Sequence, residues 1–459
     1  MFKKIERFLF FIFIFLIPLQ TRVILYQWSN TGFNEWTSAF LYGTDILLVL
    51  IFLLWFWRYK SKRFFKNLEI KTEGLIKSPV FWLILFFIIS FVSISFADNV
   101  GLGFYQISKL MEFIILFFYI RSNLTLKDIE EDDDNISKIK FRKLVHIFLA
   151  SGLVQACIAI LQYAKQHSLG LKYLAESPLN TEIGGVAKIV VGGVKMLRVY
   201  GVFPHPNILA AFLLVNILFL YYIWTTKKHT FTKNCLLMIA YFVFLFSLLL
   251  TFSRTIIAIT LIVSIIYFIF SFVKAKKNKD ISLMKRTIFI LFVLIILCSV
   301  FVNLAKPEIF SRFKISSTEE SITLRNFYNE TALINIADYP FIGLGLGNFV
   351  WNMRSFLSLL ADWTHQPVHN IYLLIASEVG LFGLSVFLFF IFSLVRNMIV
   401  FVKKQKNDYF IILTLFFIIF SLLSIGLMDH FLWTLQQGQL ILWLFLGLVA
   451  TYYTIDIQK

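Results

Sequence analysis

Three arginines and one histidine are the residues of this sequence best suited to chemistry. They are Arg198 in RVYGVFPHPN, Arg254 in TFSRT, Arg325 in TLRNF and His369 in THQPVHNIYLL. A guanidinium is a planar, permanent cation that fits phosphate oxygens, and a neutral imidazole can accept a proton near neutral pH. If the four side chains meet at the outer surface of a membrane, they suit a lipid-linked pyrophosphate beside a general base. Each arginine alone could instead be an interfacial anchor.

Five further polar residues are candidates for the same site. His205 and Asn207 belong to PHPN, which predicts the start and cap of a helix together with a contact to the substrate. Asn370 directly follows the candidate base, which could itself simply cap its helix. Asp429 and His430, in MDHFLWTLQQG, could position an acceptor or serve only as a cap. These five residues are therefore candidate substrate contacts with a structural alternative.

The sequence predicts neither a metal centre nor a cofactor. The three cysteines show no spacing typical of zinc sites or disulfide frameworks. The first segment expected outside the membrane, QWSNTGFNEWT, offers only Glu35 as a carboxylate, and the acidic run at 132–134 falls in a segment expected on the other side. We therefore expect arginines, and no divalent cation, to neutralise a bound pyrophosphate.

The composition requires that these residues be positioned by membrane helices. Of 459 residues, 59% are hydrophobic and only 15% are charged, whereas about a quarter are charged in soluble domains. Apolar runs near the ~20 residues that span a bilayer as a helix recur along the whole chain. Barrel strands would instead alternate apolar and polar residues over short stretches. We expect an all-α polytopic membrane protein that forms a single integral membrane domain over residues 1–459.

Twelve transmembrane helices are predicted from the apolar runs. We expect them near 8–26, 38–57, 79–97, 103–120, 144–163, 207–224, 235–252, 255–273, 287–304, 370–395, 410–428 and 438–454. Lysine and arginine concentrate in alternate connecting segments, which by the positive-inside rule places both termini in the cytoplasm. The protein is thus expected in the cytoplasmic membrane, and its net charge of +17 reflects topology and not nucleic-acid binding.

Two of the predicted external loops are long, at 164–206 and 305–369. The first is glycine-rich, which implies turns or close backbone approach. In the second, apolar residues recur at helical spacing after Ser-Thr-Glu-Glu, which predicts a short amphipathic helix on the membrane surface that ends at Pro340. These apolar residues are Leu324, Phe327, Tyr328, Leu333 and Ile336. The sequence FIGLGLGNF after the helix predicts a tight turn and no nucleotide loop.

Ionisable residues inside the predicted spans support a competing hypothesis. Asp45, Lys109, Glu112 and Glu378 lie within apolar runs, where charges are costly and usually face a partner or a cavity. Lys109 and Glu112 are three residues apart on one helix face, so we expect them to neutralise each other. The alternative is a substrate path in a transporter of small anions, although the sequence shows no inverted repeat. Trp28, Trp36 and Trp433 are expected as interfacial belt residues.

The stretch from Arg198 to Gly383 resembles the O-antigen ligase and O-antigen polymerase superfamily of bacterial envelope glycan assembly. Its signatures stand in order: RVYGVFPHPN before a span, TFSR at a helical hairpin, and LRNFYNETALINIADYPFIGLGLGNF. HNIYLLIASEVGLFG then fits the ligase pattern of His-Asn, nine residues, Gly, two residues and Gly. Residues 198–383 are accordingly expected to form the ligase- or polymerase-like core.

The resemblance implies a GT-C-like fold and metal-independent glycosyl transfer from an undecaprenyl-pyrophosphate donor. Arg198 and Arg254 match arginines that hold the pyrophosphate, Arg325 matches a third external arginine, and His369 matches the proposed base. The acceptor-side loops differ from the Gram-negative ligases. The acceptor is therefore a lipid A core, a growing glycan or a protein, the last corresponding to an O-oligosaccharyltransferase. The expected partners are the glycan donor, this acceptor and the lipid bilayer, without nucleic acid.

Overall fold

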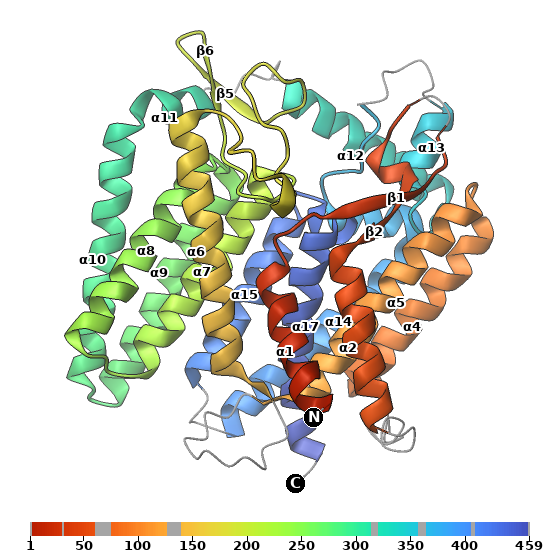
Figure 1. Ribbon diagram of the computed structural model, residues 1–459. Coiled ribbons are helices and arrows are strands. Elements are labelled where there is room, and N and C mark those ends of the chain that lie inside the picture. The colour runs from red at the N-terminus through yellow and green to blue at the C-terminus, as the bar shows by residue number, and fades with distance from the viewer. Residues whose placement is uncertain are drawn as a thin grey trace.

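The computed structural model shows a bundle of long helices capped at one end by loops, short helices and small sheets (Figure 1). It describes residues 2–29, 32–59, 75–125, 139–313, 320–356, 364–404 and 409–457. The acidic run at 132–134 lies outside these residues. The architecture confirms the all-α polytopic membrane class.

A long helix lies at each of the twelve predicted spans. They are α1 (Phe2–Leu16), α2 (Gly43–Tyr59), α4 (Pro79–Ser93), α5 (Val100–Asn123), α6 (Phe141–Lys165), α7 (Pro206–Thr226), α8 (Phe231–Leu250), α9 (Arg254–Lys277), α10 (Ile281–Leu304), α14 (Ile371–Lys404), α15 (Tyr409–Gly426) and α17 (Gln436–Ile457). Among the described residues, nine helices are long and apolar enough to cross a membrane. That set leaves out α17, together with α1 and α2, which have 15 and 17 residues.

The first predicted span was placed too far along the chain. Helix α1 ends at Leu16, and the chain continues as strand β1 (Arg22–Gln27), antiparallel to β2 (Ser38–Tyr42). Pro18 follows the helix and cannot continue its hydrogen-bond pattern, so the apolar residues Val23 to Leu25 become part of an exposed strand. Hydrophobicity alone did not distinguish this strand from the end of a helix.

Helix α7 is the central helix of the bundle. It contacts α6, α8, α9, α15 and α17, and every residue of its apolar stretch is buried. The sequence of α7 is apolar on all sides, which is typical of a helix surrounded by other helices. Its first turn is therefore held firmly at the end of the bundle that carries the loops.

Both long loops lie at that same end, whereas α1 begins and α17 ends at the opposite one (Figure 1). Between α6 and α7, strands β5 (Lys188–Val191) and β6 (Val194–Leu197) form a hairpin. Its two-residue turn is Gly192-Gly193, with φ angles of 56° and 85°, a conformation that favours glycine. The glycine-rich segment thus contains the predicted turns, but the hairpin itself was not anticipated. Which end faces the cytoplasm stays a prediction.

The second loop contains α11 (Lys306–Phe313), α12 (Glu320–Asp338) and α13 (Phe349–Phe356). Helix α12 confirms the predicted helix before Pro340, but its buried face differs from the expected one. Tyr328, Ala332 and Asn335 are buried, whereas Leu333 is 56% exposed. The remaining short elements are α16 (Phe431–Thr434), the parallel strands β3 (Leu124–Thr125) and β4 (Ile139–Lys140), and the 3-10 helices η1 (Glu35–Thr37), η2 (Leu75–Lys77), η3 (Ile94–Phe96) and η4 (Lys172–Leu174).

Candidate active site

Asn207, in the first turn of α7, joins three segments at the loop end of the bundle. Its side-chain oxygen accepts hydrogen bonds from Nη2 of Arg198 at 2.9 Å and from Oγ of Ser253 at 3.0 Å. Its side-chain nitrogen donates to Oδ2 of Asp429 at 2.7 Å. Because both sides of the amide have partners of fixed polarity, its orientation is set. Asn207 thus connects the arginine segments to the turn between α15 and α16.

Arg198 belongs to this network, and Arg254 directly follows Ser253, which also belongs to it. Arg198 is buried, and its Nε donates to the carbonyl oxygen of Thr251 at 2.7 Å. Arg254 is the first residue of α9, where the helix end favours anions. The preceding turn includes Phe252 at φ 47°, a left-handed conformation that is costly for a non-glycine residue. Strain and buried arginine contacts together fix the TFSR turn beside Asn207.

His369, Asp429 and His430 form the centre of the cluster. Nδ1 of His369 lies 3.9 Å from Oδ1 of Asp429, within ion-pair distance but beyond a hydrogen bond. The rings of His369 and His430 are 4.8 Å apart. The backbone nitrogen of His430 donates to Oδ1 of Asp429 at 2.8 Å, and Nδ1 of His430 pairs with Oγ1 of Thr434 at 2.7 Å. Two imidazoles therefore share one buried carboxylate.

The electrostatics of the cluster favour an ionised Asp429 and neutral side chains for His205 and His430. Burial raises the pKa of Asp429, but the neighbouring imidazoles of His369, His430 and His205 outweigh it and hold that pKa below its usual range. Burial lowers the pKa of His205 to about 3, with a further contribution from Arg198. Burial, followed by the charge of His369, lowers the pKa of His430 to about 3 as well. His205 and His430 are thus neutral at physiological pH.

Arg325 lies on α12, near this cluster. It is partly buried, and its charge contributes to lowering the pKa of both His205 and His430. One turn further along α12, the ring of Tyr328 lies 6.0 Å from the ring of His369, and its hydroxyl donates to the carbonyl oxygen of Thr364 at 2.6 Å. The sequence indicated Tyr328 only as part of an apolar face. Its spacing of three from Arg325 was the available signal for a place in the site.

Two candidate contacts prove to be helix caps. Nδ1 of His205 accepts from the backbone nitrogen of Asn207 at 3.2 Å, as the sequence predicted for the start of α7. The side-chain oxygen of Asn370 accepts from the backbone nitrogens of Tyr372 and Leu373 at 2.9 and 3.2 Å. Asn370 therefore caps α14, and its expected contact with the substrate stays a prediction. That cap fixes the chain beside His369.

The same cluster also has the composition of a metal site. One ligand atom from each of His369, Asp429 and His430 lies within 4.8 Å of the other two, and imidazole and carboxylate groups are common zinc ligands. However, both oxygens of Asp429 already accept hydrogen bonds, from Asn207 and from the backbone of His430. The three side chains can therefore act in proton transfer without a bound metal. Whether they bind a metal instead can be tested directly with a chelator.

Residues 239–388 match the protein family described as O-antigen ligase. This match confirms the resemblance to the O-antigen ligase and O-antigen polymerase superfamily. No curated protein matches the chain. Of the predicted site residues, Arg254, Arg325, His369 and Asn370 lie in the ligase segment. Arg198, Asn207 and Asp429 lie outside residues 239–388, and the fold brings them close to His369, which lies within that range.

The first of the two glycines of the ligase motif, Gly380, has a structural explanation. Helix α14 is interrupted there, with φ 79° and ψ 170°. The backbone nitrogen of Leu381 donates to the carbonyl oxygen of Pro340 at 2.8 Å, and that of Leu344 donates to the carbonyl oxygen of Ser377 at 2.9 Å. A Cβ atom at position 380 would lie only 2.1 Å from the carbonyl oxygen of Phe341. The FIGLGLGNF turn, with positive φ at its three glycines, thus packs directly on α14.

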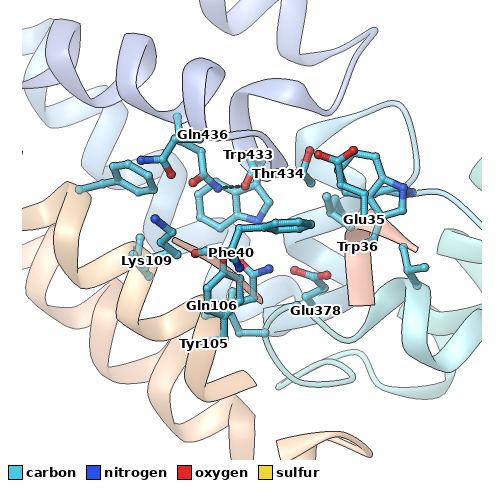
Figure 2. A pocket seen from close by; sticks show the side chains of 18 of the residues that line it. Glu35, Trp36, Phe40, Tyr105, Gln106, Lys109, Glu378, Trp433, Thr434 and Gln436 are labelled. Carbon is cyan, nitrogen blue, oxygen red and sulfur yellow. Dashed lines mark hydrogen bonds between the residues drawn. The ribbon is translucent and has the colours of Figure 1, made fainter. Parts of the chain in front are cut away.

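A cavity with aromatic and polar walls adjoins the cluster (Figure 2). It lies between β2, α5, α14 and the α16–α17 segment, and Trp36 and Trp433 line it. The sequence indicated these two tryptophans as interfacial belt residues. Trp433 is instead 7% exposed, and the ring of Trp36 lies 5.0 Å from that of His430. Sequence reasoning missed the cavity because its walls come from both ends of the chain.

Proposed function

We propose that this protein transfers a glycan from an undecaprenyl-pyrophosphate donor to an acceptor hydroxyl at the outer face of the cytoplasmic membrane, without a metal. The family match supports O-antigen ligase-like glycosyl transfer. The observation that carries the finer proposal is the hydrogen-bonded path from Arg198 through Asn207 to Asp429, which lies beside His369. Groups suited to a leaving pyrophosphate and to proton removal are thereby held in one site.

In the proposed reaction the acceptor oxygen attacks the anomeric carbon of the donor sugar while the bond to pyrophosphate breaks. Negative charge grows on the pyrophosphate, so the fixed guanidiniums of Arg198, Arg254 and Arg325 stabilise the transition state more than the ground state. His369 accepts the proton from the attacking hydroxyl. Asp429 stabilises the imidazolium that forms, and attack opposite the leaving group inverts the anomeric centre.

Several features support this reading over transport of a small anion. Lys109 is buried and donates to Asp45 at 2.6 Å and to Glu112 at 3.2 Å. The amide of Gln436 also donates to Asp45. Lys109 is therefore held between two carboxylates, which includes the expected pairing of Lys109 with Glu112, and the polar cluster lies at the helix ends. Reconstituted vesicles should accordingly show glycan transfer and no anion flux.

The direct test uses purified protein in lipid nanodiscs with a fluorescent oligosaccharide on undecaprenyl pyrophosphate. Envelope extract from a strain without the gene supplies glycan, lipid and protein acceptors together. We expect transfer of the label that persists in EDTA. Labelled product that requires the enzyme supports the proposal. Its absence with every acceptor fraction would overturn the transfer proposal, and loss of activity in EDTA with recovery on added zinc would assign a metal to His369, Asp429 and His430.

The proposed orientation, with both termini in the cytoplasm, has its own test. Tyr173 is 99% exposed in the first long loop, and Lys228 is exposed between α7 and α8. In a background lacking the three cysteines, Tyr173→Cys should react with a membrane-impermeant maleimide in intact cells. Lys228→Cys should react only after permeabilisation. The opposite pattern would reverse the topology.

A further inference from the structure

The cavity beside the histidine cluster has the lining of a ligand site. The space inside it that is open to the centre of a water molecule is about 70 Å³, enough for several waters. Small-molecule pockets are usually concave, with aromatic walls and a few directed polar groups. Figure 2 shows Trp36, Phe40, Tyr105 and Trp433 around the cavity together with carboxylate and amide side chains.

The lining combines aromatic faces with hydrogen-bonding groups. A sugar ring has an apolar face of C–H groups that can stack on an aromatic ring, and hydroxyl groups around its edge. Gln106 faces the cavity and makes no hydrogen bond to any described residue, so its amide is available both to donate and to accept. Glu378 and Gln436 add an acceptor and a further amide. A lipid chain would leave the amide of Gln106 without a partner, at a cost that a sugar avoids.

The charges at the cavity select against anions. Among the described residues that line the cavity the one cation is Lys109, which is paired with Asp45 at 2.6 Å, and the lining carboxylate Glu35 is paired with Arg22. Glu112 also contacts Lys109, and Glu378 is buried on the cavity wall. Carboxylates therefore outnumber cations among these residues. A phosphate or a uronic acid would meet like charge, whereas a neutral sugar would not.

The cavity is continuous with the proposed centre of reaction. The Trp36 ring is perpendicular to the His430 ring at 5.0 Å, and Oγ1 of Thr434, on the cavity wall, pairs with Nδ1 of His430. Trp36 is held there by η1, whose cap Asn34 donates to the carbonyl oxygen of His365 at 3.1 Å. The arginine network reaches the same turn through Asp429. The turn thus lies between the arginine-containing network and the aromatic cavity.

We propose that this cavity binds a neutral sugar residue of the acceptor glycan. The proposal rests on the proposed function, since it assigns the pyrophosphate to the arginine side of the Asp429–His430 turn and the attacking sugar to the other. It narrows the acceptor classes, because a protein or lipid acceptor would have to present a neutral sugar at its reactive end.

The test measures sugar binding separately from transfer. Protein in nanodiscs, free of sugar-headed detergents, is titrated with the methyl glycosides of glucose, galactose and N-acetylglucosamine and with methyl glucuronide, using saturation-transfer NMR. At least one neutral glycoside should bind, and the glucuronide should bind at least tenfold more weakly. Gln106→Leu should weaken the neutral sugar about fivefold, the usual contribution of one hydrogen bond. Ser108→Ala, on an exposed face of α5, is the matched control.

The outcomes separate this proposal from the proposed function. Gln106→Leu must melt at the wild-type temperature, as expected for a side chain without protein partners. If its melting temperature falls, the isosteric Gln106→Glu takes its place as the test. Gln106→Glu adds a negative charge to a cavity that already contains carboxylates, and it must also weaken sugar binding. Failure of every neutral sugar, equal binding of the glucuronide, or unchanged binding in the position-106 variants would overturn the cavity assignment even if transfer occurs. Sugar binding that persists without any transfer would instead count against the proposed function.

Discussion

The side-chain amide of Asn207 donates to the carboxylate of Asp429 at 2.7 Å, across 222 residues of sequence. The same amide accepts from Arg198 and Ser253, so it transmits the position of the arginine segments to the aspartate between α15 and α16. An aspartate or leucine at position 207 could not accept on one side and donate on the other. This relationship makes Asn207 a positioning residue for the proposed site.

Asn207→Asp should destabilise the protein and reduce transfer. The substitution removes the donor to Asp429 and places a second carboxylate beside it, which we expect to cost about 2 kcal/mol or more in unfolding free energy. Asn303→Asp, at the exposed end of α10, is the control and should be close to neutral. Thermal unfolding in nanodiscs measures the difference. Equal melting temperatures for the two variants would show that the bond to Asp429 contributes little.

His369→Ala should abolish most transfer while leaving donor binding intact. A general base contributes about 10²–10⁴ in rate, and the side chain is only partly buried, so the fold should tolerate its removal. His369→Gln, which can hydrogen-bond but cannot accept a proton at neutral pH, should fail equally. Turnover and donor affinity are measured separately in the nanodisc assay. An active Gln variant would assign an orienting role to His369. The proton would then have to be accepted by another group.

Arg254→Lys and Arg198→Lys should fail in different ways. Lysine keeps the charge but loses the paired, planar hydrogen bonds of a guanidinium. Arg198 is buried and holds both Thr251 and Asn207, so its replacement should lower the melting temperature together with activity. Arg254, at the start of α9, should lose donor affinity with little change in melting temperature. Near wild-type turnover in Arg254→Lys would leave it as an interfacial anchor only.

The sequence predicted the helices well because apolar runs of spanning length have few other structures open to them in a membrane. It also proposed Arg198, Arg254, Arg325 and His369 as site residues, through motifs that are local in the chain. It could not show that Asn207 bonds to Asp429. That bond joins helix ends brought together only by packing around α7, and neither residue carries a local signal of its partner.

The errors have equally specific causes. The first span was extended into β1 because exposed apolar residues in a short strand have the same hydropathy as the end of a helix. Trp433 was interpreted as a belt residue because an aromatic near a helix end is typical of the membrane interface. Its burial beside the cavity depends on packing that no local pattern reports, including contact with the rings of Phe86 and Phe387.

Gly380→Ala should disrupt the site from a distance. The φ of 79° at position 380 is rarely adopted by alanine, and the new Cβ atom would overlap the carbonyl oxygen of Phe341. The FIGLGLGNF turn would then have to move away from α14. Gly184→Ala, where a Cβ atom meets nothing, is the control. We expect a lower melting temperature and reduced transfer only for position 380, measured by thermal unfolding and turnover. An unchanged melting temperature and turnover would show that the close packing of the FIGLGLGNF turn on Gly380 is not required.

Acid should destabilise the protein through His430 in a defined pH range. Burial lowers the pKa of His430 to about 3, whereas an unfolded histidine titrates near ~6.5. Between these values the unfolded state binds more protons than the folded state, so stability rises with pH and falls as the pH drops from about 6.5 towards 3. The lowered pKa of Asp429 acts in the same direction, but only below its unfolded value of about 3.9.

His430→Asn should therefore reduce the loss of melting temperature between pH 6.5 and 4.5. The asparagine amide can replace the contact of Nδ1 with Thr434 but has no proton to gain in this range. His146→Asn, at an exposed position on α6, provides the matched control and should keep the wild-type slope. Melting temperatures recorded at half-unit steps of pH give the comparison. If the slope of His430→Asn equals that of the wild type, the acid sensitivity arises elsewhere and His430 is not held neutral by its burial beside His369.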